Sequence, residues 1–308
     1  MVIKTGARKV ESIAPVVEQA PAQVVDPTKA AETQIKHGII DGLSNSEYHG
    51  AKEWLGSTSL KTLGLKTPAH YKYESTHHVF KDEFNLGTAA HSLILENDTS
   101  NIEVLEYQNY LTKAAKEAKA VAIADNKQPL LAKEWEQVQA MRDSVMNHPV
   151  AGQLFKGHVP ERSFFWEQDG MKFKVRPDAL REDLIVDLKT TVNADTNEFG
   201  KTAFNYGYFI SAALYQEGVR RVTGKKLPFV FVNVEKTAPY LVSVTELDED
   251  ALSLGHAMIE RATRIYKECT ESGVWPGYPT RTTASLPLWA YSALEDLELP
   301  ELTFGKGN

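Results

Sequence analysis

Between positions 159 and 190, apolar and polar residues alternate with the period of two that is typical of β-strands. The alternation is clearest at the end of this segment. One face of that strand carries Leu184, Val186 and Leu188, and the other carries Ile185, Asp187 and Lys189. Asp187 and Lys189 are therefore expected to be neighbours on one face of a sheet.

A further strand is expected at 171–175, and Pro177 ends it because proline offers no N–H to a strand ladder. A short turn at 181–183 leads from there into the alternating strand. A hairpin-like pairing of the two strands would bring Asp178 beside Asp187.

The chain before this hairpin is expected to form a strand at 159–166, followed by a turn at 168–170. Glu161 then lies on the strand next to the one that leads to Asp178. Three basic residues share one face of the 171–175 strand and its extension. They are Lys172, Lys174 and Arg176, and they form the clearest local basic stripe in the sequence.

Helical periodicity recurs in five segments. The expected helices are 57–67, 86–96, 131–147, 204–222 and 248–269. Gly224 is a natural end for the fourth helix, and Asp248 is a natural cap for the fifth. Two apolar segments are expected to form paired strands, 227–234 and 240–244, and the polar segment 191–201 is expected to form a loop.

Two features allow more than one interpretation. Residues 102–125 are charged and rich in alanine, which indicates an exposed helix or a mobile arm over a cleft. Its lysines at 113, 116 and 119 either meet phosphates or form a solvated helical face. His91 has apolar neighbours, so it faces inward or into a cleft, as a core histidine or as a functional group.

Composition removes several classes of site. The chain of 308 residues has one cysteine, Cys269, which excludes an intrachain disulfide framework, a cysteine-rich zinc site and a four-cysteine iron–sulfur cluster. The net charge of −7 does not indicate a nucleic-acid-binding protein. A protein of this charge that acts on nucleic acid would have to concentrate its positive charge locally.

Domain organisation follows from composition along the chain. Residues 1–36 have little aromatic content and no lasting periodicity, which predicts a flexible N-terminal arm. Residues 37–308 are expected to form a single domain. No apolar run approaches the length of a membrane span and no signal-peptide core is visible, so we expect a cytoplasmic protein without a membrane partner.

The acidic and basic groups around residues 178–189 suit a hard cation. Two carboxylates, Asp178 and Asp187, beside the ammonium group of Lys189 favour Mg²⁺, which prefers carboxylate, water and phosphate oxygens. A surface hairpin with a solvated charge pair is the alternative that this segment alone allows.

The order of motifs resembles the PD-(D/E)xK nucleases. Arg176-Pro177-Asp178 and Asp187-Leu188-Lys189-Thr190 match the two halves of that signature. From about residue 38 to 290, the sequence resembles the RecB-like branch and, more closely, the exonuclease VIII (RecE) family of phages and prophages. The other matching segments are 57–68, Gly87-Thr88-Ala89-Ala90-His91 and Trp275-Pro276-Gly277-Tyr278.

The resemblance implies a fold and a set of roles. The fold is α/β, a restriction-endonuclease-like core with a central mixed sheet flanked by helices. The implied catalytic residues are Asp178, Asp187, Lys189, Glu161 and His91, and the metal site comprises Asp178, Asp187, Leu188, His91 and Glu161. One ion is expected between Asp178 and Asp187 and a second near His91 and Glu161. The expected DNA contacts are Tyr215, Ser211, Lys172, Lys174 and Arg176, with Ser211 standing where the family pattern has glutamine.

The resemblance also implies an activity. It is Mg²⁺-dependent digestion of linear double-stranded DNA from 5′ to 3′, with Mn²⁺ able to substitute, in a bacterial or phage-infected cell. It further implies a ring-shaped homo-oligomer and a RecT-like single-strand annealing partner for recombination. The alternatives are a RecB-like structure-specific endonuclease, or a DNA-binding or assembly module with a silent site.

Overall fold

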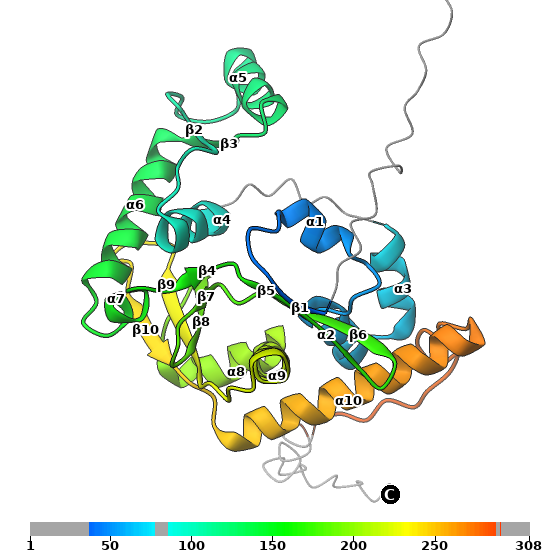
Figure 1. Ribbon diagram of the computed structural model, residues 1–308. Coiled ribbons are helices and arrows are strands. Elements are labelled where there is room, and N and C mark those ends of the chain that lie inside the picture. Colours follow the sequence, from blue (N-terminus) through cyan, green and yellow to red (C-terminus); the bar gives the residue numbers. More distant parts are fainter. Residues whose placement is uncertain (1–36, 78–85, 288–289, 291–308) are drawn as a thin grey trace, which may run out of the picture. The chain divides into compact units, whose positions relative to one another are not determined.

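A five-stranded mixed sheet carries the region that the sequence singles out. The computed structural model describes residues 37–77, 86–287 and 290, and the predicted N-terminal arm at 1–36 lies outside them. The strand order is β10-β9-β8-β7-β4, in which β8 and β9 are parallel and the other pairs are antiparallel (Figure 1). The strands are β4 Val159–Pro160, β7 Ala179–Leu180, β8 Ile185–Thr191, β9 Phe229–Glu235 and β10 Val242–Thr245.

Helices cover both faces of this sheet, as predicted. The helices in the described part of the chain are α1 Asn45–Gly50, α2 Ser57–Leu65, α3 Pro68–Thr76, α4 Leu86–His91, α5 Lys113–Ala124, α6 Ala132–Asn147, α7 Ala151–Leu154, α8 Thr196–Tyr206, α9 Tyr208–Thr223 and α10 Glu249–Ser272. A π-helical turn, Ser92–Glu96, follows α4. None of the helices in the described residues is long and apolar enough to cross a membrane.

The alternation of β8 divides its side chains between two hydrophobic cores. Ile185 packs in one core, with residues of α2, α8, α9 and α10. Val186 and Leu188 pack in the other, with residues of α4 and α6. The predicted alternation is therefore confirmed, and Asp187 and Lys189 share the parity of Ile185.

A second sheet stands beside the first and corrects the predicted hairpin. It has the order β1-β5-β6, with β1 Gly38–Ile40, β5 Ser163–Gln168 and β6 Met171–Val175. β6 pairs with β5 and not with β8. The short strand β7 pairs with β8 instead, in a register that places Ala179 opposite Val186. The turn joining β7 and β8 is closed by a hydrogen bond of 2.9 Å from the Arg181 N–H to the Leu184 carbonyl.

Two predicted elements are interrupted by residues with a positive φ angle. The strand expected at 159–166 is split into β4 and β5 at Glu161, whose φ is +48°. The helix expected at 204–222 breaks at Gly207, whose φ is +65°. α8 begins inside the segment predicted as a loop, because the Asp195 carboxylate accepts from the Asn197 N–H and caps it.

The remaining elements follow the sequence closely in some places and not in others. β9 and β10 pair as predicted, and the Asp248 carboxylate accepts from the Ala251 N–H at 2.8 Å to cap α10. The segment 102–125 contains the helix α5 but also β2, Ile102–Leu105. β2 pairs in parallel with β3, Gln128–Leu131, which the polar and proline-containing sequence did not predict.

Candidate metal and catalytic site

Asp178, in the first half of the signature, is hydrogen-bonded to the strand that carries the second half. It precedes β7, and its Oδ2 atom accepts a hydrogen bond of 2.7 Å from the backbone N–H of Leu188 on β8. Leu188, expected among the metal ligands, thus enters the site through its backbone. Its side chain is fully buried in a hydrophobic core and offers no ligand atom.

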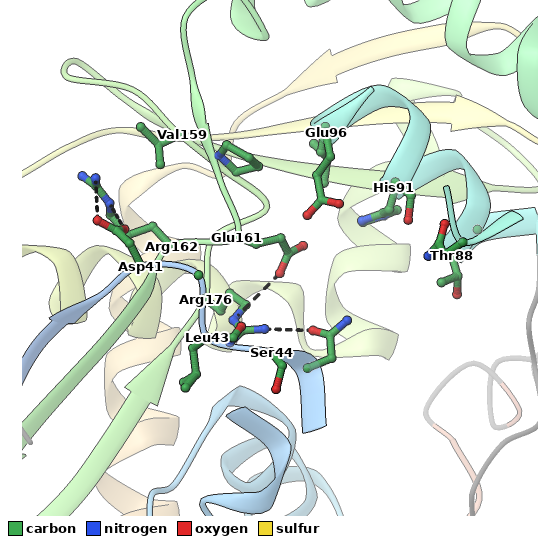
Figure 2. A pocket seen from close by; sticks show the side chains of 17 residues that line it. Asp41, Leu43, Ser44, Thr88, His91, Glu96, Val159, Glu161, Arg162 and Arg176 are labelled. Atoms are coloured by element: carbon green, nitrogen blue, oxygen red, sulfur yellow. Dashed lines mark hydrogen bonds and ion pairs between the residues drawn. The ribbon is translucent and has the colours of Figure 1, made fainter. Parts of the chain in front are cut away.

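Glu161 and His91 complete a group of three side chains that could hold a metal ion. The backbone N–H of Glu161 donates to the carbonyl of Asp178 at 3.2 Å. His91, the last residue of α4, places Nδ1 3.7 Å from Asp178 Oδ2. One ligand atom from each of His91, Glu161 and Asp178 lies within 4.8 Å of the other two. Figure 2 shows Glu161 and His91 facing the same space.

The environment of Glu161 disfavours its negative charge. Burial and the neighbouring Asp178 carboxylate raise its pKa to about 8, although the guanidinium of Arg176 acts in the opposite direction. Arg176 Nε lies 3.9 Å from Glu161 Oε2. Glu96 also raises the pKa of Glu161, and it lines the same cavity.

Asp187 and Lys189 form an ion pair on β8. Their side chains are 5% and 25% exposed. Burial raises the pKa of Asp187, against the effect of Lys189. Burial alone would lower the pKa of Lys189, but Asp187 and Asp178 outweigh it and raise that pKa. Lys189 is therefore an ammonium ion at neutral pH, and it lies 5.1 Å from the ring centre of Tyr208.

The grouping of acidic residues differs from the expected one. The sequence placed one ion between Asp178 and Asp187 and another near His91 and Glu161. Within the described residues, the structure brings Asp178 together with His91 and Glu161, while Asp187 pairs with Lys189. Besides burial and Lys189, Asp178 raises the pKa of Asp187 and His91 lowers it. The predicted metal contact of Asp187 stays a prediction.

The donor set fits a divalent cation. Two carboxylates and one imidazole converge, and mutual repulsion of Asp178 and Glu161 would be relieved by a positive ion. Carboxylate oxygens suit Mg²⁺ and Mn²⁺, and the imidazole adds a preference for ions that accept nitrogen. The adjoining cavity has a volume of about 900 Å³, and its lining includes Thr88, Glu96 and Arg176.

The predicted basic stripe is not an exposed surface. Lys174 and Arg176 are each 6% exposed, and their N–H groups are used within the protein. Lys174 Nζ donates to the carbonyls of Tyr48 and Ala51. Arg176 donates at 2.8 Å to three acceptors, which are Ser163 Oγ, Asn45 Oδ1 and the Leu43 carbonyl. Of the three basic residues, only Lys172 is exposed, with Nζ 5.2 Å from the ring centre of Trp54.

Ser211 and Tyr215 lie on α9, and neither lines the cavity beside His91. Tyr215 is nevertheless close enough to Asp187 and Asp178 for both carboxylates, after burial, to contribute to raising its pKa. Ser211 is buried. Tyr215 lines a different cavity of about 240 Å³, together with Lys174 and the first residues of α2. Burial raises its pKa well above the ordinary value, and a hydrogen bond with Ser57 acts against that shift. The expected contact of these two residues with DNA stays a prediction.

The comparisons with known proteins agree with this geometry. The family model described as "PDDEXK-like domain of unknown function (DUF3799)" matches residues 56–283. The chain belongs to this family. The PD-(D/E)xK resemblance is thereby confirmed, and membership of the narrower RecE family stays a prediction. No curated protein matches the sequence.

Two solved structures resemble this PDDEXK-like domain. One, from Eubacterium rectale, is described as a "Putative exonuclease". It is 18% identical and has a TM-score of 0.54, and the match covers 81% of this chain and 97% of the other. This likeness establishes the fold. The second, described as "SSO0001", is 15% identical with a TM-score of 0.30, and the match covers 74% of this chain and 88% of the other.

Proposed function

We propose that this protein is a divalent-metal-dependent exodeoxyribonuclease that degrades linear double-stranded DNA. One observation carries the proposal: His91, Glu161 and Asp178 converge next to a strand that holds the Asp187–Lys189 ion pair. Membership of a PDDEXK-like family supports the same reaction class, which is hydrolysis of a phosphodiester bond.

His91, Glu161 and Asp178 are the residues that would hold the ion. When bound there, Mg²⁺ or Mn²⁺ would supply a Lewis acid for the phosphate and an acidified water. The Leu188 N–H fixes one oxygen of Asp178. The Glu161 N–H binds the Asp178 carbonyl, so the two carboxylate residues keep a set spacing.

Lys189 contributes a fixed positive charge. Its raised pKa makes it a poor proton acceptor, so its proposed role is to neutralise charge that develops on the phosphate and to orient the attacking water. Asp187 positions the ammonium group through their ion pair. In this proposal, Lys189 of β8 neutralises the charge of the substrate phosphate, and His91, Glu161 and Asp178 hold the metal ion.

The finer features of the proposal come from the resemblance to exonuclease VIII. They are 5′→3′ polarity, 3′ single-stranded products, a ring-shaped homo-oligomer, a RecT-like annealing partner, and action in the cytoplasm of a bacterial or phage-infected cell. Phosphate contacts carry no base information, so a processive exonuclease of this kind needs little sequence readout.

End-labelled duplexes test the proposal. The purified chain is incubated with Mg²⁺, Mn²⁺ or EDTA and with linear duplexes labelled at the 5′ or the 3′ end. We expect metal-dependent release of mononucleotides with the 5′ label released first, and no cleavage in EDTA. Covalently closed circular DNA is the matched substrate: cutting it as fast as linear DNA would establish an endonuclease and refute the exonuclease assignment.

A further inference from the structure

Lys61 lies near the proposed catalytic pair, Asp187 and Lys189, and has no role in the proposed mechanism. It lies on α2, is half-buried, and senses the charges of both Lys189 and Asp187. Burial and the Lys189 ammonium lower its pKa, against the effect of Asp187. Among the residues that the structure describes, none forms a hydrogen bond or ion pair with its ammonium group. Asp187 offsets only part of the cost of burial and of repulsion by Lys189, so a further anion near Lys61 and Lys189 would be stabilised by both cations.

The stem of Lys61 is positioned by the break between α8 and α9. A Cβ atom at Gly207 would lie 2.8 Å from Lys61 Cδ and 2.9 Å from Cγ, so this close approach requires glycine. The positive φ of Gly207 also favours glycine. The lysine stem therefore runs across the backbone that separates Tyr206 from Tyr208.

An exposed aromatic ring stands at the same place. Tyr206 is 64% exposed. Its ring is stacked on that of Tyr208, with centres 5.7 Å apart and planes inclined by 20°. Tyr208 in turn lies 5.1 Å from Lys189 Nζ. The break between α8 and α9 thus brings together the exposed Tyr206 ring, the stem of Lys61 and, through Tyr208, the ammonium group of Lys189.

We propose that Lys61 and Tyr206 form a strand-binding subsite, in which Lys61 binds a backbone phosphate of the substrate strand and Tyr206 stacks on a base. The inference rests on the proposed nuclease function. Aromatic rings and cations in alternation are the combination that binds single-stranded nucleic acid without sequence preference. Stacking on Tyr206 requires an unpaired base, so the subsite would hold a strand that has separated from its complement.

Binding measured without metal tests Lys61. A fluorescently labelled single-stranded DNA oligonucleotide is titrated with the full chain in EDTA, at several salt concentrations. We expect Lys61→Met to weaken binding and to reduce the slope of log K against log salt by about 0.7, the loss of one phosphate contact. Lys61→Arg should retain both. Lys267→Met, which removes an equal charge from exposed α10, is the control. Equal affinities and slopes for Lys61→Met and the control would overturn the assignment.

The stacking role has its own matched pair of variants. Tyr206→Ala should weaken binding between about 5-fold and 100-fold, which is the range of one base–aromatic stack. Tyr206→Phe should bind as the wild type does. A change in oligomeric state by sedimentation with unchanged DNA affinity would instead make Tyr206 a contact between protein molecules and refute the subsite. Should Lys61→Met fail to fold by circular dichroism, Lys61→Gln serves in its place.

The cleavage assay separates this subsite from the function on which it rests. In Mn²⁺, Lys61→Met and Tyr206→Ala should raise KM for linear DNA much more than they lower kcat. Wild-type protein that fails to cut while these variants still lose affinity would refute the nuclease and retain the subsite. Wild-type protein that cuts, with variants indistinguishable from Lys267→Met in KM, would refute the subsite alone.

Discussion

Strands β6 and β8 look alike in sequence and serve different purposes. Each alternates charged with apolar residues and carries a lysine, which is buried in β6 and half-buried in β8. Lys174 of β6 faces two backbone carbonyls, so its donors fasten the segment that contains Tyr48 and Ala51 to the sheet. Lys189 of β8 faces a buried carboxylate, Asp187. The acceptors of the two lysines therefore distinguish their roles. Lys174 binds neutral carbonyls and serves as a structural anchor, whereas Lys189 pairs with a carboxylate near further acidic groups, which is the pattern of the candidate catalytic site.

Breaking the ion pair of β8 should have the largest effect. Lys189→Met removes the charge proposed to face the phosphate, and we expect cleavage to fall by about 10²–10³-fold. It also leaves Asp187 buried without its cation, which should cost about 3–5 kcal/mol of unfolding free energy.

A double variant separates these two consequences. Asp187→Asn combined with Lys189→Met should recover most of the lost stability in urea denaturation, because neither member of the pair is left as an unpaired charge. Activity should not recover. Full activity in either variant would contradict the role given to Lys189.

Metal binding should raise the unfolding free energy through the ligand group beside β8, and this gain should not depend on Lys174 of β6. At 100 times its dissociation constant, Mn²⁺ should add about 2.7 kcal/mol to the unfolding free energy, and EDTA should remove this gain. Glu161→Gln should abolish most of the gain in thermal denaturation, because the group of three ligands loses a carboxylate. Lys174→Met should keep it in full, and a loss there would show that the two regions are linked.

Removing the anchor of β6 should reduce stability without reducing catalysis. Lys174→Met leaves the Tyr48 and Ala51 carbonyls without their donor, at a cost of about 1–3 kcal/mol. The exposed neighbour Lys172 provides the control, and Lys172→Met should change stability by less than about 0.5 kcal/mol. Activity per folded molecule should be unchanged in both variants. A selective loss of DNA cleavage in Lys174→Met would instead support the DNA contact predicted for the basic stripe.

The smallest expected effect is a pH dependence of the anchor. Burial lowers the pKa of Lys174 to about 8. The unfolded chain then binds more protons than the folded one above that pH, so stability should rise with pH. The wild type should gain about 1 kcal/mol relative to Lys174→Met between about pH 8 and 9. Denaturant titrations of both proteins at these pH values measure it, and parallel curves would contradict the prediction.

The sequence predicts the regular parts of this fold better than its interruptions. The alternation of β8 and the Asp248 cap of α10 are local patterns, and both are present. The breaks at Glu161 and Gly207 depend on backbone angles that a hydrophobic pattern does not encode. Gly207 could have signalled its break, since glycine favours positive φ. Glu161 gave no comparable signal, because its conformation is set by tertiary contacts.

For the candidate site too, the sequence predicted some features and missed others. Proximity of Asp178 to β8 followed from strand pairing and a turn. The grouping of Asp178 with His91 and Glu161, and the pairing of Asp187 with Lys189, did not, because they depend on side-chain directions at the ends of strands. The burial of Lys174 and Arg176 was also beyond the sequence, since the segment that covers them is more than a hundred residues away in the chain. Lys61 was overlooked because it sits in a helix-start motif with no acidic neighbours.

Glu161 and Asp178 each occupy a crossing, where the chain passes between the two sheets. The hydrogen bond from the Glu161 N–H to the Asp178 carbonyl connects these two crossing segments. Any sliding of one sheet against the other would therefore carry both acids as a unit. His91 arrives separately, at the end of α4. A metal ion held by all three groups, as proposed, would therefore link the two chain crossings to the end of α4.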